Sequence, residues 1–175
     1  MKILSADIPF DPQGNPLFAQ LCDSTKNLHA WWKTIFFHTP KIDKRRWATA
    51  TYQECGLEWC SDHNNLPRPD VMTTAGVDWV LNAKAYQALR HLLNDTGDFY
   101  AAHIGDGEAI YLYLCWESLS LEAAKERVPH VFHIDHQSMI DHRDIPNGTL
   151  FVSDHFRATI TENSITGLLV KEIIV

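Results

Sequence analysis

The sequence predicts an α+β fold, with a mixed β-sheet and helices packed against it in a single domain spanning residues 1–175. The main observation is a strand–helix unit that occurs twice, each time as a hydrophobic strand ending at a small polar residue and continuing directly into a helix. Further apolar runs follow each unit, but without the regular alternation of strand and helix that is typical of a parallel sheet. The 45% hydrophobic and 21% charged fractions fit a globular chain that buries its own core.

Each unit has a polar residue where a helix N-cap belongs. Asn82 ends the first strand and Ser153 ends the second, and both side chains are able to accept a hydrogen bond from an unpaired amide of the first helical turn. Apolar side chains then recur with helical spacing. The predicted strand and helix are 77–82 and 83–93 in the first unit, and 150–153 and 154–160 in the second. After the first helix, Gly97 is suited to a left-handed position that ends the helix.

The segment between the units predicts a β-hairpin and further short elements. Gly105-Asp106-Gly107 is typical of a turn between strands at 100–104 and 109–116. The second of these strands is apolar on both faces, which indicates a central strand covered on both sides. Ser120 is placed to cap a short helix over 121–127. Additional strands are predicted over 2–5, 47–52 and 131–135, and residues 28–36 have helical spacing, although 32–37 also fits a strand.

The four cysteines, Cys22, Cys55, Cys60 and Cys115, are expected to be reduced and mostly buried. The first residues reach Asp7 before any apolar signal segment develops, so we expect a cytoplasmic protein with free thiols. Cys55 and Cys60 have four residues between them, which is not the spacing of a redox motif and is marginal for zinc. The longest apolar run, 109–116, is too short to span a membrane.

The net charge of −7 is concentrated in the second half of the chain. Residues 1–94 carry ten Lys or Arg and nine Asp or Glu, whereas residues 95–175 carry five and thirteen. Nucleic acid is disfavoured as a partner, because phosphates need a basic surface. A basic protein partner is favoured, because a negative field speeds its encounter. Solubility alone accounts for the acidic surplus equally well.

The strongest candidate for enzyme chemistry is the group of ionisable residues between His130 and Asp144. It offers His133 and His136 as metal ligands with nearby carboxylates, which keeps a metal-dependent hydrolase open as an alternative. However, a strand over 131–135 would point His133 and His136 to opposite sides. The chain has no metal-hydrolase spacing, nucleophile elbow, P-loop or dinucleotide fingerprint. We therefore expect no enzyme activity and no cofactor.

Five short segments of the second part of the chain follow one another in a recognisable order. They are Leu66-Pro67-Arg68-Pro69-Asp70, Phe99-Tyr100, Tyr111-Leu112-Tyr113-Leu114, Leu150-Phe151-Val152-Ser153-Asp154-His155-Phe156 and Ile165-Thr166-Gly167-Leu168. In this order they resemble a family of small bacterial immunity proteins from polymorphic toxin systems, in which a Val-Ser step opens a helix and a glycine precedes the last strand. The resemblance covers about residues 66–175, and residues 1–65 show no such likeness.

The resemblance implies a non-enzymatic inhibitor that binds and neutralises a cognate toxin domain inside the producing cell. Many such toxins are nucleases with basic clefts, which suits the acidic half of this chain. The candidate partner contacts are an aromatic residue and four acids expected in loops: Trp59, Asp95, Asp98, Asp106 and Glu108. For any one of these residues taken alone, an ordinary solvated loop position is a better explanation than a partner contact. A plain protein-interaction adaptor is the remaining alternative.

Overall fold

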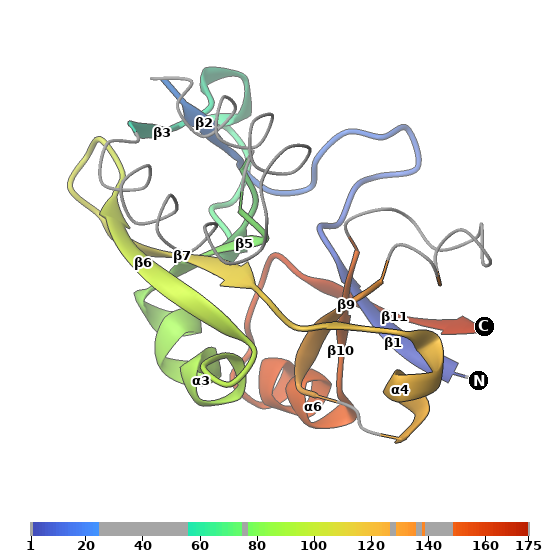
Figure 1. Ribbon diagram of the computed structural model, residues 1–175. Coiled ribbons are helices and arrows are strands. Elements are labelled where there is room, and N and C mark those ends of the chain that lie inside the picture. Colours follow the sequence, from blue (N-terminus) through green and yellow to red (C-terminus); the bar gives the residue numbers. More distant parts are fainter. Residues whose placement is uncertain are drawn as a thin grey trace.

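The structure is a computed structural model that describes residues 2–24, 56–74, 77–126, 129–135, 138 and 149–174. The helix expected over 28–36 and the strand expected over 47–52 lie outside the described residues. The α+β prediction is confirmed: mixed sheets and helices form a single domain. Figure 1 shows two main sheets with helices beneath them and a short ribbon of two strands above.

The larger sheet has five strands, and the N-terminal strand lies inside it. All neighbours are antiparallel except β8 and β9, which are parallel. The order is β11 (Leu169–Ile174), β1 (Lys2–Asp7), β10 (Leu150–Val152), β9 (Val131–Ile134) and β8 (Ser118–Leu119). Because β1 pairs with β10 on one side and β11 on the other, the chain's first residues belong to the same sheet as its last ones. Residue 66, where the family resemblance begins, is therefore not a boundary of this sheet.

The second sheet has four antiparallel strands and contains the predicted hairpin. Its order is β4 (Val71–Met72), β5 (Trp79–Asn82), β7 (Ala109–Cys115) and β6 (Gly97–His103). β6 and β7 pair along their full length, and Gly107 in the turn has a φ of +89°, which favours glycine. β7 lies between β5 and β6, as its two apolar faces predicted, and Leu112 and Tyr113 are fully buried.

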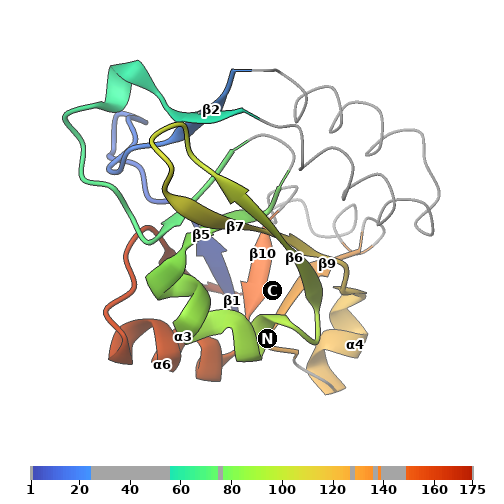
Figure 2. The same cartoon turned by 90° about the vertical axis from the view of Figure 1, so that its left-hand side faces the viewer.

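Both predicted strand–helix units are confirmed, including their caps. α3 (Ala83–Leu93) begins at Asn82, whose Oδ1 accepts a hydrogen bond of 2.9 Å from the amide of Ala85. α6 (Asp154–Glu162) begins at Ser153, whose Oγ accepts one of 3.1 Å from the amide of Phe156. The two helices contact each other and lie side by side in both views (Figures 1 and 2). A third helix, α4 (Leu121–Glu126), packs beside β8 and has the predicted cap at Ser120.

One aromatic stack joins the two units within the core. The Trp79 ring on β5 lies 5.9 Å from the Tyr113 ring on β7 and 5.5 Å from the Phe156 ring on α6. The same cluster of buried side chains includes Leu4 of β1 and Val131 of β9, so it takes residues from both sheets. Burial of these large apolar side chains is the main stabilising contribution to the fold.

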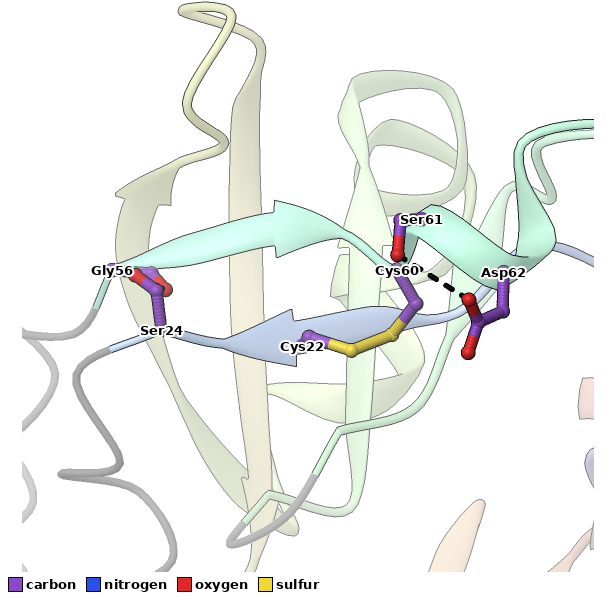
Figure 3. Close-up of a disulfide and its surroundings, with 6 residues drawn as sticks. All are labelled: Cys22, Ser24, Gly56, Cys60, Ser61 and Asp62. Atoms are coloured by element: carbon purple, nitrogen blue, oxygen red, sulfur yellow. Dashed lines mark hydrogen bonds between the residues drawn. A yellow bond between two sulfur atoms is a disulfide. The ribbon is translucent and has the colours of Figure 1, made fainter.

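The expectation that the cysteines are all reduced is wrong for one pair. Cys22 and Cys60 form a disulfide with a Cα–Cα distance of 5.3 Å (Figure 3). It links Cys22 in β2 (Leu21–Asp23) to the residue that follows β3 (Leu57–Trp59), and these two antiparallel strands form the short ribbon. The two cysteines are 38 residues apart in the sequence, and the pairing of β2 with β3 brings them together. Cys115 is a buried free thiol, as expected.

The prediction for Gly97 is also wrong. Gly97 begins β6 and is not among the described glycines with positive φ. A Cβ at this position would collide with the carbonyl oxygen of Leu114 and with the Tyr113 ring, whose Cζ would be only 2.6 Å away. Glycine is therefore needed here for the close approach of β7, not to end the helix.

Candidate functional site

The short ribbon lies against the tip of the β6–β7 hairpin. The amide of Gly105 donates a hydrogen bond of 2.9 Å to the carbonyl oxygen of Leu57, and Leu57 forms an isolated β-bridge with Ile104. Both side chains are buried. In Figure 1, β3 is seen beside the upper end of this hairpin. The contact brings Trp59 of β3 to the turn that carries Asp106 and Glu108.

Arg68 connects these three predicted contact residues. Its guanidinium carbon lies 4.7 Å from the centre of the Trp59 ring, a cation–π contact. Its Nη1 is 3.4 Å from Asp106 Oδ2 and 3.7 Å from Glu108 Oε2. The side chains of Arg68, Asp106 and Glu108 are 58%, 47% and 37% exposed, so water screens these ion pairs and they contribute little to stability. The charged groups stay accessible to a partner.

A shallow, open pocket of about 310 Å³ lies at the same place. Its lining is Glu58, Trp59, Ile104, Gly105 and Asp106. Trp59 is half-buried and gives the lining an aromatic residue, and the two acids contribute negative charge. The indole Nε1 of Trp59 is buried and has no hydrogen-bond partner among the described residues. We call the group formed by Glu58, Trp59, Arg68, Asp106 and Glu108 the Trp59 surface.

The other two predicted contact acids lie elsewhere. Asp98 was expected in a loop, but it is in β6, at the opposite end of the hairpin from Asp106. Its Oδ2 accepts a hydrogen bond of 2.6 Å from the indole of Trp116. Asp95 is exposed in the turn after α3, where its charge acts on His130. The five candidates therefore do not form one surface: three lie together and two lie apart.

The structure gives His133 a neighbour that the sequence did not predict. His133 Nε2 lies 3.2 Å from Asp78 Oδ1, and Asp78 Oδ2 accepts a hydrogen bond of 2.7 Å from the amide of Cys115. This pair joins β9 of the larger sheet to the four-stranded sheet. Asp135, a carboxylate close to His133 in the sequence, accepts a hydrogen bond of 2.8 Å from the amide of Ser138.

The metal-site alternative gains no support within the described ranges. His136 lies outside the described residues. Among those that are described, no three His, Cys, Asp or Glu side chains are grouped so that they could hold a metal ion.

The Asp78–His133 pair predicts a pH-dependent contribution to stability. Burial disfavours the charged imidazole, but the hydrogen bond and the negative charge of Asp78 outweigh it and raise the pKa of His133 above its ordinary value. The contribution is therefore complete below the ordinary histidine pKa of about 6.5 and is lost as the pH rises through the folded-state value. We expect His133→Gln to lower the free energy of unfolding more at about pH 5.5 than at about pH 8.

Urea unfolding of both proteins at the two pH values measures this difference. The pKa of His130 is shifted in the opposite direction, because burial and the charges of His155 and His91 lower it. His130 is present in both proteins and cancels in the comparison. An equal loss at both pH values would contradict the role given to Asp78.

A second polar network joins two segments of the family resemblance. Asp70 Oδ2 accepts hydrogen bonds from Lys84 Nζ at 2.9 Å and from the amide and hydroxyl of Thr166 at 2.9 and 3.0 Å. Asp70 Oδ1 accepts one from Asn82 at 2.9 Å. Burial opposes the charged carboxylate, but these bonds outweigh it and lower the pKa of Asp70. The network fixes the start of α3 to the segment before β11, which is a structural role.

Sequence reasoning missed two members of the Trp59 surface. Arg68 is the only Lys or Arg between residues 47 and 83, so its isolation was a signal that was available. Glu58 had no such signal, because only the pairing of β3 with β2 sets the direction of its side chain.

Comparison of the chain with protein-family models, with curated proteins and with solved structures finds no match. Within the described ranges, none of the helices has both the length and the apolar character needed to cross a membrane. Function therefore has to be inferred from the residues of the site and the sequence.

Proposed function

We propose that this protein is an immunity protein, which binds and neutralises a cognate bacterial toxin domain without catalysing a reaction. The observation that carries the proposal is the Trp59 surface. Three of the residues expected from the sequence to contact a partner, Trp59, Asp106 and Glu108, meet there on exposed elements. An aromatic anchor beside accessible acids is the chemistry with which an interface holds a basic partner.

The charge distribution supports a basic toxin of the nuclease type. Thirteen of the 22 acidic residues lie in residues 95–175, against five of the 15 basic ones. A nuclease needs a basic cleft to hold phosphates, and a negative inhibitor is drawn to that cleft by the same field. Nucleic acid itself would be repelled, so we do not propose it as a partner.

The family resemblance supports the same function from a different part of the molecule. Its segments at 66–70 and 165–168 are held together through Asp70 and Thr166, and its Val-Ser step is the cap of α6. Shared segments that build the scaffold leave the docking surface free to differ between relatives with different toxins. This fits a family in which each member recognises its own toxin.

We place the site of action in the cytoplasm, where the toxin would reach its target. Disulfides are rare in that compartment, so the redox state of Cys22 and Cys60 tests this part of the proposal. Thiol trapping in rapidly quenched cells measures it. A reduced pair supports the cytoplasm, and an oxidised pair points to an oxidising compartment.

Co-expression with the toxin encoded by the neighbouring gene tests the function itself. We expect the protein to restore growth, to co-purify with the toxin domain, and to release it as salt is raised, because the attraction between unlike charges is screened. The double variant Trp59→Ala with Asp106→Asn is expected to protect less. Glu162→Gln, which removes one exposed acid at the end of α6, is the control. A protein that neither binds the toxin nor restores growth contradicts the proposal.

A further inference from the structure

We infer that the pocket between β3 and the β6–β7 hairpin receives an arginine side chain of the partner, and that Arg68 competes for the same groups in the free protein. The inference deepens the proposed function and rests on it for the identity of the partner as a toxin domain. It specifies the chemistry at the centre of the interface: a guanidinium between an indole ring and carboxylates.

Arg68 shows how the Trp59 surface binds a guanidinium within the protein itself. The group lies over the Trp59 ring at 4.7 Å and within 3.4 Å of one carboxylate oxygen, on Asp106, and 3.7 Å of another, on Glu108. A planar cation between an aromatic face and acceptor oxygens is the arrangement that arginine favours. The groups of the Trp59 surface are therefore suited to bind an arginine side chain.

The charges of this surface are not balanced by Arg68. Two carboxylates, those of Asp106 and Glu108, lie near the single guanidinium of Arg68, and a third acid, Glu58, lines the pocket beside Asp106. No Lys or Arg of the described residues lies within ion-pair distance of Glu58, although Glu58 lines the open pocket with Asp106. A cation entering the pocket would meet both of these acids, because Glu58 and Asp106 belong to its lining. The excess negative charge therefore favours a cationic occupant.

The shape favours arginine over lysine. The pocket is open, is close to the lower limit of small-ligand sites in volume, and is lined in part by Trp59. A guanidinium stacks flat on an indole ring and is more weakly hydrated than an ammonium, so it loses less on leaving water. An ammonium is also attracted to the ring and to the carboxylates, but it is more strongly hydrated and cannot stack flat on the indole.

The surface is held in place before the partner arrives. The bond from Gly105 to Leu57 fixes the hairpin against β3, and Asp106 Oδ1 accepts a hydrogen bond of 3.1 Å from the amide of Glu108. When the Cys22–Cys60 pair is oxidised, as in the structure, Cys60, the residue after Trp59, is also tied to β2 (Figure 3). A preformed surface loses little conformational freedom on binding, which favours affinity.

Titration of the full chain with capped glycine-rich pentapeptides tests the inference. Each peptide has one central arginine, lysine or citrulline, and the readout is the indole N–H signal of Trp59, assigned with Trp59→Phe. We expect weak binding, with a Kd of about 1 mM, and the arginine peptide should bind most tightly. The citrulline peptide should not bind, because citrulline keeps the shape of arginine but has no charge. Arg68→Ala should tighten arginine-peptide binding about three- to tenfold by removing the competitor.

Two variants and one control decide the outcome. Glu58→Gln with Asp106→Asn should abolish binding, while an unchanged dispersed spectrum shows that the fold is kept. Arg157→Ala, which removes a surface arginine paired with Asp154 on α6, should leave the affinity unchanged. Equal binding of the citrulline peptide, or weaker binding to Arg68→Ala, would overturn the inference.

Toxin neutralisation separates a failure of this inference from a failure of the proposed function. A protein that protects cells equally well with and without the Glu58 and Asp106 carboxylates keeps its proposed function, and the arginine pocket is then wrong. If the protein binds the arginine peptide as described but protects against no toxin, the arginine pocket is supported and the proposed function is wrong.

Discussion

Gly167→Ala is expected to lower the free energy of unfolding by about 2–5 kcal/mol, the largest effect of any substitution considered. Gly167 has a φ of +96°, in the left-handed region, where a Cβ costs about 1–2 kcal/mol. The added methyl would also collide with the carbonyl oxygen of Val71 and lie 2.7 Å from Pro69 Cβ. Backbone must move to accommodate it, which adds an overpacking cost of about 1–3 kcal/mol.

Gly14→Ala is the matched control for this prediction. Gly14 has a similar φ of +85°, but a Cβ there would meet nothing within 4 Å. It should therefore show only the conformational cost, about 1–2 kcal/mol. Chemical denaturation of the three proteins gives both values, and the difference between the variants isolates the close contact with Val71. Equal losses in the two variants would show that this contact carries no energy.

The location of Gly167 explains why the effect should be large. The amide of Val71 donates a hydrogen bond of 3.0 Å to the carbonyl oxygen of Thr166, beside the bonds between Thr166 and Asp70. Movement of the backbone at Gly167 would pull this segment from β4. The hydrogen bonds of Asp70 to Lys84 and Asn82 would then weaken as well, and these bonds hold the start of α3. A glycine before the last strand, one feature of the family resemblance, thus has a physical reason in this chain.

The sequence predicted those parts of the fold that depend on local interactions. Asn82 and Ser153 cap helices with bonds to residues three positions away, so the necessary information is contained in one turn. The hairpin turn at Gly107 is equally local. Gly97 and the Cys22–Cys60 pair were misread because their roles depend on contacts with β7 and on the pairing of β2 with β3. No local pattern contains such contacts.

The candidate site follows the same rule. Residue type alone identified Trp59, Asp106 and Glu108 as candidates. They lie close together because Leu57 contacts the tip of the hairpin. Asp98 was also a candidate by residue type, but it lies in β6, paired with β7, and its side chain accepts a hydrogen bond from Trp116. Residue chemistry therefore identifies candidates, whereas tertiary contacts decide which of them act together.

Removal of the disulfide by Cys22→Ser with Cys60→Ser is expected to lower the free energy of unfolding by about 2–4 kcal/mol. The bond closes a loop of 38 residues, and the unfolded chain without it gains conformational entropy that grows with loop length. Denaturant unfolding of wild type and variant measures the loss. Dithiothreitol should lower the stability of wild type by a similar amount and leave the double variant unchanged, since its buried Cys115 forms no disulfide.

The same variant links stability to the docking surface. Cys60 follows Trp59 directly, and the paired part of the ribbon is short, because β2 and β3 are each three residues long. Without the disulfide, Trp59 should sample more positions relative to Asp106, and the arginine peptide should bind more weakly to the variant than to wild type. A variant that loses stability but binds the peptide equally well would show that the contact between Leu57 and Gly105 alone keeps Trp59 in place.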